Sequence, residues 1–173
     1  MQRLALKQRI DQRITAKVAS LLSPKSLGTI ATMCPFDFNK KLINYLLNDA
    51  FVEQIADGDF EFLQGRNLMV ELIDAGCFIG ISYVNQRLLC NYFDSVSIAS
   101  DATLSLNSYD AILLIEQTID PDTLFFQRKL KISGDTELAH QAKNTIDTLD
   151  QERIPKVVLR LASLYRERFA LST

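Results

Sequence analysis

The side chains best suited to catalysis or metal binding are few and widely spaced in this sequence. One histidine, His140, and three cysteines, Cys34, Cys77 and Cys90, occur in 173 residues, and no two cysteines have C-x-x-C spacing. A Cys/His zinc site needs about four such ligands at close spacing. His140 lies about 200° around a predicted helix from the apolar Leu138, hence on its exposed side. We therefore expect no metal site, no cofactor, and cysteines that act as small buried apolar residues in a reducing cytoplasm.

Motifs for nucleophilic or phosphate chemistry are missing as well. The sequence contains no G-x-S-x-G, P-loop, G-x-G-x-x-G or H-E-x-x-H motif. Because the one histidine is expected on the surface, a Ser/His/Asp or Cys/His relay would have no base. The carboxylate pairs Asp57/Asp59 and Asp120/Asp122 stand at predicted turns and helix starts, where structural roles are common. These observations argue against an enzyme.

Apolar side chains are abundant instead. The chain has 10 Phe and 5 Tyr, with a hydrophobic fraction of 47% and a charged fraction of 23%, which is typical of a globular protein. The net charge of −2 argues against a nucleic-acid partner, since binding to a phosphate backbone requires basic residues. Pockets with few polar groups bind apolar ligands through shape and buried area. The sequence therefore favours a binding function over a catalytic one.

Charge is distributed unevenly along the chain. Residues 1–22 carry five Lys or Arg against one Asp, and residues 151–173 carry five against two Glu. In both segments apolar residues recur at three- and four-residue steps, which predicts amphipathic helices. Two interpretations stay open: the helices dock on the domain with solvated basic faces, or they lie on anionic lipid. In the second interpretation the membrane-surface residues are Arg9, Arg13, Lys17, Lys156 and Arg160.

No stretch of the sequence is predicted to cross a membrane. The longest uncharged run, residues 75–86, has 12 residues, whereas a spanning helix needs about 20 apolar ones. Charged residues from Lys7 to Lys17 also interrupt any apolar core of a signal peptide. We therefore expect a cytoplasmic protein.

The middle of the chain predicts a helix, a small sheet and further helices. Apolar residues at helical spacing predict a helix over residues 36–56, ended by Asp57-Gly58-Asp59. The links between the strands that follow are too short for βαβ crossovers, so the sheet should be mainly antiparallel. The predicted strands are 60–63, 67–73, 77–84, 87–93, 96–100 and 130–133, and the later helices are 105–117, a short one from Asp120-Pro121, and 136–149.

Residues 120–138 resemble part of a known family. They read Asp-Pro-Asp-Thr-Leu-Phe-Phe-Gln-Arg-Lys-Leu-Lys-Ile-Ser-Gly-Asp-Thr-Glu-Leu, which combines a short helix, basic residues, a strand and a Gly-Asp helix start. This order resembles the closing segment of the sterol carrier protein type-2 lipid-binding family. Residues 60–66 are similar to that family's first strand and turn, and the order of elements agrees over residues 36–149.

The resemblance implies an α+β fold with a five-stranded antiparallel sheet, helices on one face and a hydrophobic tunnel between them, and no catalytic activity. On this basis we expect three parts: an N-terminal basic amphipathic helix and connector (1–35), a lipid-binding domain (36–150) and a C-terminal basic amphipathic helix (151–173). The tunnel lining is predicted to include Leu47, Phe51, Leu68, Val70, Leu72, Ile79, Ile81, Leu113, Phe125, Phe126 and Ile132. Both faces of strand 77–84 are apolar, so the face that lines the tunnel stays open there.

Within that family, the same residues resemble those of the accessory factors of bacterial oxygen-independent ubiquinone synthesis. That resemblance implies a polyprenylated aromatic intermediate, an isoprenoid quinone precursor, or a phospholipid as the ligand. It implies iron–sulfur hydroxylase-like proteins as partners, and any cluster belongs to them because the three cysteines lack cluster spacing. Where the terminal helices bind lipid, the protein would be peripheral on the inner face of the bacterial membrane.

Two other functions stay open on the sequence. A protein–protein adaptor would present an apolar face to a partner and would have a filled core. An enzyme acting on an apolar substrate would need a buried carboxyl group with a perturbed pKa inside the pocket, and Asp94 with Tyr92 are the candidates.

Overall fold

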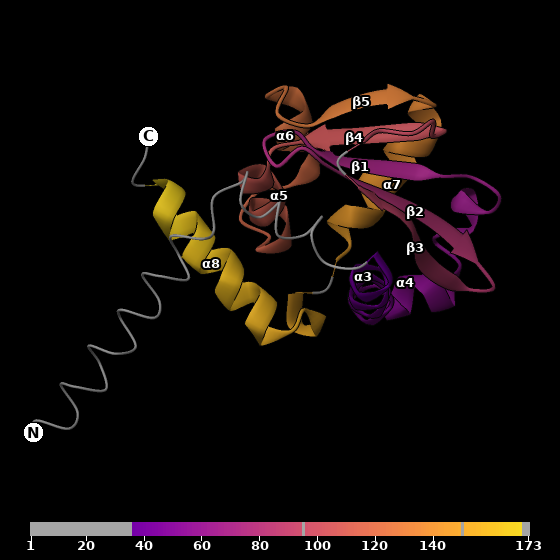
Figure 1. Cartoon of the computed structure of the whole chain (residues 1–173), viewed down its shortest axis with the longest axis horizontal. Coiled ribbons are helices and arrows are strands. Elements are labelled where there is room, and N and C mark those ends of the chain that lie inside the picture. The colour runs from indigo at the N-terminus through magenta and orange to yellow at the C-terminus, as the bar shows by residue number, and fades with distance from the viewer. Residues whose placement is uncertain (1–35, 95, 150, 171–173) are drawn as a thin grey trace, which may run out of the picture.

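Five strands form one mixed sheet in the order β3-β2-β1-β4-β5 in the computed structural model, which describes residues 36–94, 96–149 and 151–170 (Figure 1). Three of the four strand pairings are antiparallel and β1 runs parallel to β4, so the prediction of a mainly antiparallel sheet is confirmed. The strands are β1 (Leu68–Leu72), β2 (Cys77–Val84), β3 (Arg87–Asp94), β4 (Ala102–Leu106) and β5 (Lys131–Gly134).

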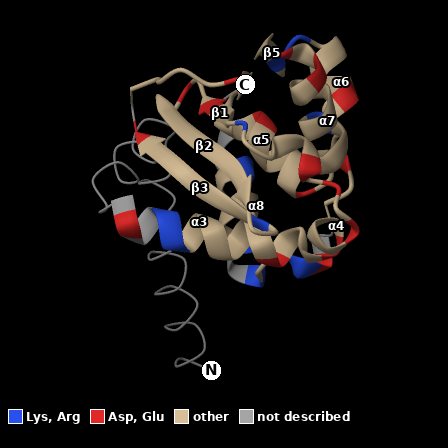
Figure 2. Cartoon of the chain, turned by 90° about the vertical axis from the view of Figure 1, so that its right-hand side faces the viewer, with Lys and Arg blue, Asp and Glu red and all other residues tan. Residues whose placement is uncertain are grey.

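The helices gather on one face of this sheet, as the two perpendicular views show (Figures 1 and 2). Charged residues lie mainly on the helices and at strand ends, and β2 carries none along its length (Figure 2). The helical elements are α3 (Phe36–Ala50), α4 (Val52–Asp57), the 3₁₀ turn η1 (Glu61–Leu63), α5 (Ser108–Ile115), α6 (Pro121–Phe126), α7 (Thr136–Asp147), the 3₁₀ turn η2 (Gln151–Arg153) and α8 (Lys156–Ala170).

The strand register aligns apolar side chains in rows on one face. Val70 of β1 lies opposite Ile79 of β2 and beside Leu104 of β4, and Leu104 in turn pairs with Ile132 of β5. Opposite residues in neighbouring strands point to the same face of a sheet. Leu68 and Leu72 of β1 point to the same face as Val70, and their partners in β2 and β4 are apolar as well. The face of the sheet that carries Val70 is therefore apolar along the length of β1.

Two of the predicted strands are wrong. Residues 60–63 form no strand: Gly58 adopts a left-handed φ of 83°, and Phe60 then begins the turn η1, whose last amide, that of Leu63, donates to the Phe60 carbonyl at 3.0 Å. Residues 96–100 form no strand. The strand next to β1 is Ala102–Leu106 instead, although a helix was predicted to begin at residue 105. The helix α5 begins only at Ser108.

The helix predicted over residues 36–56 is broken once, at Phe51, into α3 and α4. Two asparagines on one side of α3 bind the backbone of the edge strand β3. The Asn44 Oδ1 accepts from the Cys90 amide at 2.6 Å. Asn48 accepts from the Leu88 amide at 3.1 Å and donates to the Leu88 carbonyl at 2.7 Å. Helix α3 is therefore hydrogen-bonded along the margin of the sheet.

Aspartate side chains cap α6 and α7, at the two helix starts that the sequence predicted. Asp120 accepts from the Thr123 amide and hydroxyl, both at 2.7 Å. Asp135 accepts from the Leu138 amide at 3.0 Å and forms an ion pair with Arg66 at 2.9 Å. These contacts hold both carboxylates ionised, and the pKa of each lies below its ordinary value.

Helix α8 packs on the domain through one face. Tyr165 is 1% exposed and Ala162 is buried, and the Arg166 Nε lies 2.7 Å from the Glu116 Oε2 just after α5. Lys156 and Arg160 are exposed on the same helix, so docking leaves these predicted membrane-surface residues free to face water or lipid. Arg9, Arg13 and Lys17 lie outside the described residues. Among the described helices none is long and apolar enough to cross a membrane.

Candidate functional site

An apolar cavity of about 330 Å³ lies between the sheet and the helices. All of the residues that line it are apolar, and they come from every layer of the fold: the sheet, α3, α5, α7 and the turns between them. The register explains one wall, because Leu68, Val70, Leu104 and Leu106 share the apolar face of the sheet. Leu104 is 1% exposed and still borders empty space. A cavity of this kind binds an apolar molecule by shape and area.

Seven residues predicted for the lining border this cavity. They are Leu47, Phe51, Leu68, Val70, Leu72, Ile79 and Ile81. The pairing of β1 with β2 settles which face of β2 is involved, because Ile79 and Ile81 lie opposite Val70 and Leu68. Phe51 sits at the break between α3 and α4, where its ring meets Phe60 edge-on at 5.3 Å.

Four residues predicted for the lining do not border the cavity. On α5 the neighbour Leu114 borders it in place of Leu113. On α6 the inward position belongs to Leu124, which is fully buried, so Phe125 and Phe126 turn outward, and Phe126 is 79% exposed. Ile132 is on the correct face of the sheet but at the edge strand β5, where it packs against the core beyond the cavity.

Several lining residues were missed because their elements were assigned differently. Leu104 and Leu106 alternate with Thr103 and Ser105, which is the period-2 pattern of a half-buried strand and could have identified β4. The remaining missed residues come from α3, η1 and the residue before it, β3, α5 and the α6–α7 region: Ile43, Phe60, Phe62, Leu63, Leu88, Ala111, Leu114, Ile115, Pro121, Leu130, Ala142, Ile146 and Leu149.

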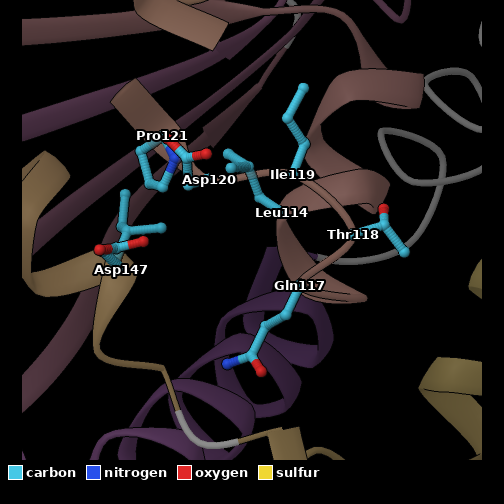
Figure 3. A pocket seen from close by; sticks show the side chains of 8 residues that line it. Leu114, Gln117, Thr118, Ile119, Asp120, Pro121 and Asp147 are labelled. Atoms are coloured by element: carbon cyan, nitrogen blue, oxygen red, sulfur yellow. The ribbon is translucent and has the colours of Figure 1, made fainter. Parts of the chain in front are cut away.

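A second, polar pocket of about 350 Å³ adjoins the cavity (Figure 3). The two share Leu114, Pro121 and Ile146 as lining residues. Figure 3 shows Asp147, from the end of α7, on one side of the pocket, and Gln117 and Thr118, from the loop after α5, on the other. The pocket therefore places polar groups beside the apolar interior.

The groups considered for catalysis lie apart from the cavity. Tyr92 donates to the Val96 carbonyl at 2.5 Å and Asp94 is exposed, and neither borders the cavity. His140 is exposed and meets the Phe125 ring at 5.7 Å. Burial raises the pKa of the Cys77 thiol to about 11, which keeps it protonated and unreactive at neutral pH. No cluster of His, Cys, Asp and Glu in the described parts of the chain is arranged to hold a metal ion.

A mixed five-stranded sheet with helices over one face encloses an apolar cavity, which is suited to binding an apolar molecule. The sequence matches the SCP-2 sterol transfer family over residues 43–147, and the chain belongs to that family. A solved structure, described as "UbiJ-SCP2 Ubiquinone synthesis protein", has the same fold, with a TM-score of 0.51 and 17% identity over 66% of this chain and 94% of that one.

A curated relative is more similar in sequence. The chain is 34% identical over 137 residues to the ubiquinone biosynthesis accessory factor UbiT of Escherichia coli (strain K12). The aligned part covers 79% of this chain and 76% of the relative. The resemblance to the sterol carrier protein type-2 family is thus confirmed.

Proposed function

We propose that this protein is a non-catalytic, lipid-binding accessory factor of oxygen-independent ubiquinone biosynthesis. Its similarity to UbiT over most of both chains supports the pathway. The observation that carries the binding function is the cavity, whose lining is apolar throughout. In this proposal the cavity holds the isoprenoid tail of a biosynthetic intermediate and presents its head group to modifying enzymes, among them iron–sulfur hydroxylase-like proteins.

The physical need for such a factor follows from the ligand. Moving one methylene from an apolar environment into water costs about 0.8 kcal/mol, so a tail of tens of carbons stays in the membrane unless it is shielded. The cavity of about 330 Å³ is at the lower end of the range for ligand pockets, about 300–1,000 Å³. We therefore expect it to shield the part of the tail next to the head group.

The same observation weighs against the two alternative functions. An adaptor needs no empty space beneath its sheet, and here the cavity lies against fully buried residues such as Leu63 and Leu104. An enzyme of the kind considered above needs a carboxyl group inside the cavity, whereas Asp94 is exposed on β3. Peripheral membrane binding through Lys156 and Arg160, which are exposed on α8, belongs to the proposal and would bring the cavity to its source of lipid.

The test is to extract lipid from the purified protein and identify it by mass spectrometry, with and without a filled cavity. Ala111 of α5 borders the cavity, so Ala111→Phe adds apolar volume where the tail would lie. Ala56→Phe, at an exposed position of α4, is the matched control. We expect a prenylated aromatic or a phospholipid in the natural protein and the control, and little or none in a folded Ala111→Phe variant. Undiminished anaerobic ubiquinone formation by that folded variant would contradict the proposal.

A further inference from the structure

The turn between α6 and β5 presents an aromatic ring and basic side chains to solvent. Phe126, the last residue of α6, is 79% exposed, more than any other large apolar side chain in the described part of the chain. Arg128, Lys129 and Lys131 follow it and are exposed as well. Between residues 123 and 134 the sequence has these three cations and no acid. We call these four residues the α6–β5 corner, which lies at the outer edge of the sheet (Figure 1).

Most of the positive charge of the corner is not compensated. The Lys129 Nζ lies 3.8 Å from the Oδ1 of the buried Asp110. Over the described residues no ion pair joins Arg128 or Lys131 to a carboxylate. The nearest acids on either side in the sequence already pair with cations outside the corner. Two cations beside the exposed ring are therefore available to an anionic partner.

Backbone hydrogen bonds fix this arrangement. The Arg128 amide donates to the Phe125 carbonyl and the Lys129 amide to the Leu124 carbonyl, both at 2.9 Å. Arg128 takes a left-handed φ of 60°, and with these two bonds it ends the helix as a Schellman motif. The Phe125 ring meets the Phe126 ring edge-on at 5.9 Å. The turn thus holds the ring and the cations together on the outside of a tight bend.

The inner side of the same segment borders the cavity. Leu130 stands between two of the corner cations in the sequence, is 3% exposed and lines the cavity, as does Pro121 at the start of α6. Helix α6 and its turn therefore form a wall with the apolar cavity on one side and the corner on the other. A surface that binds the corner is held next to the cavity.

We infer that the α6–β5 corner docks on anionic lipid, with the Phe126 ring inserted below the head groups and Arg128 and Lys131 against the phosphates. This inference rests on the proposed function, which makes a membrane the source of the ligand. An aromatic ring flanked by Lys and Arg is typical of segments that lie in a membrane interface. A fluid bilayer accepts a protruding ring without a matching hollow, whereas a folded acidic protein would have to supply one.

The experiment exploits the absence of tryptophan from the sequence. Phe126→Trp places a single fluorophore at the corner. Tyr45→Trp, at a position 62% exposed on α3, is the matched reporter at the opposite side of the fold (Figure 1). Each full-length variant is mixed with vesicles of phosphatidylcholine, alone or with phosphatidylglycerol, whose acyl chains are plain or brominated. We expect the emission of Phe126→Trp to shift to the blue and to be quenched by bromine on the anionic vesicles only, and that of Tyr45→Trp to stay unchanged.

Neutralising the corner tests the charges. In the Phe126→Trp background, Arg128→Gln together with Lys131→Gln should weaken binding to the anionic vesicles about tenfold or more. Glutamine adopts the same left-handed conformation elsewhere in this chain, so it fits the turn. Lys41→Gln with Arg87→Gln, on α3 and at the opposite edge strand β3, removes two exposed cations away from the corner and should weaken binding less than about threefold. High salt should release the natural protein.

The outcomes separate this inference from the proposed function. An unchanged emission of Phe126→Trp on anionic vesicles, or a shift of Tyr45→Trp alone, would overturn the corner as the docking surface. Lipid that co-purifies with the protein reports on the cavity, and the corner variants should retain it, because docking alters the rate of exchange with a membrane rather than the affinity of the cavity. Natural protein that carries no lipid would overturn the proposed function, whatever the vesicles show.

Discussion

Helices α3 and α6 carry similar runs of large apolar residues, but only α3 presents them to the cavity. Leu47 of α3 and Phe51 just beyond it border the cavity, whereas Phe125 and Phe126 of α6 lie outside it. Helix α3 has 15 residues and two asparagine contacts to β3 that set its rotation. Helix α6 has six residues, and successive residues point about 100° apart, so Pro121 and Leu124, three positions apart, are buried while Phe125 and Phe126 point away from the cavity. Residue type alone does not decide which side chains border the cavity.

The strongest test of this comparison places a charge at one position on each helix. Leu47→Glu puts a carboxylate against the cavity, where it must be desolvated or admit water. We expect this folded variant to lose co-purified lipid completely, with some loss of stability. Phe126→Glu, at a position 79% exposed, should keep its lipid. Mass spectrometry of extracted lipid is the measurement, and equal loss from both variants would show that α6 also contacts the ligand.

A second test compares stability after truncation of an aromatic ring in each region. Phe51 is buried and packs edge-on against Phe60, so Phe51→Ala should lower the free energy of unfolding by about 3–5 kcal/mol. Phe126 meets Phe125 at 5.9 Å but is mostly solvated, so Phe126→Ala should cost less than about 1 kcal/mol. Urea denaturation followed by circular dichroism gives both values. A large cost for Phe126→Ala would mean that its ring is buried in solution.

The smallest effect is a difference in how the two helices respond to acid. The lowered pKa of Asp120 means that its cap stabilises α6 above about pH 4, and that this contribution is lost as the pH falls through the lowered value. The asparagine contacts of α3 do not titrate. Hydrogen exchange should therefore show the Thr123 amide losing protection below about pH 4, after correction for intrinsic rates, while the Leu88 amide keeps its protection. Equal loss at both amides would indicate global unfolding instead.

Much of the fold could be predicted from the sequence because several of its elements have strong local signals. Residues 77–84 form a strand with the predicted bounds, and the Asp-Pro and Gly-Asp signals mark the starts of α6 and α7. Seven of the eleven predicted lining residues border the cavity, and they come from long or strongly periodic elements. A period of 2 or 3.6 fixes which side chains share a face, and burial of one face then fixes the orientation.

The errors arose where tertiary structure decides the outcome. Ala102–Leu106 is a strand because it lies parallel to β1, a pairing that depends on residues more than thirty positions away. Phe60 and Phe62 look like strand residues, but Gly58 turns the chain and their rings pack against each other at 6.1 Å. The polar pocket could not be predicted from the sequence, because Gln117 and Asp147 line one pocket only when the chain folds and brings the end of α7 near the loop after α5. No spacing in the sequence encodes that meeting.

The attachment of α3 to the strand β3 also bears on how the protein behaves when it is crowded. An uncovered edge strand offers free backbone groups on which a strand from another molecule can assemble. Asn44 and Asn48 occupy the Leu88 and Cys90 groups of β3. At the opposite edge β5 has only four residues and begins with Lys131, an unfavourable template for pairing. Asn44 and Asn48 hold in place α3, which forms one wall of the cavity, and they thereby also help to keep the sheets of neighbouring copies from pairing and aggregating.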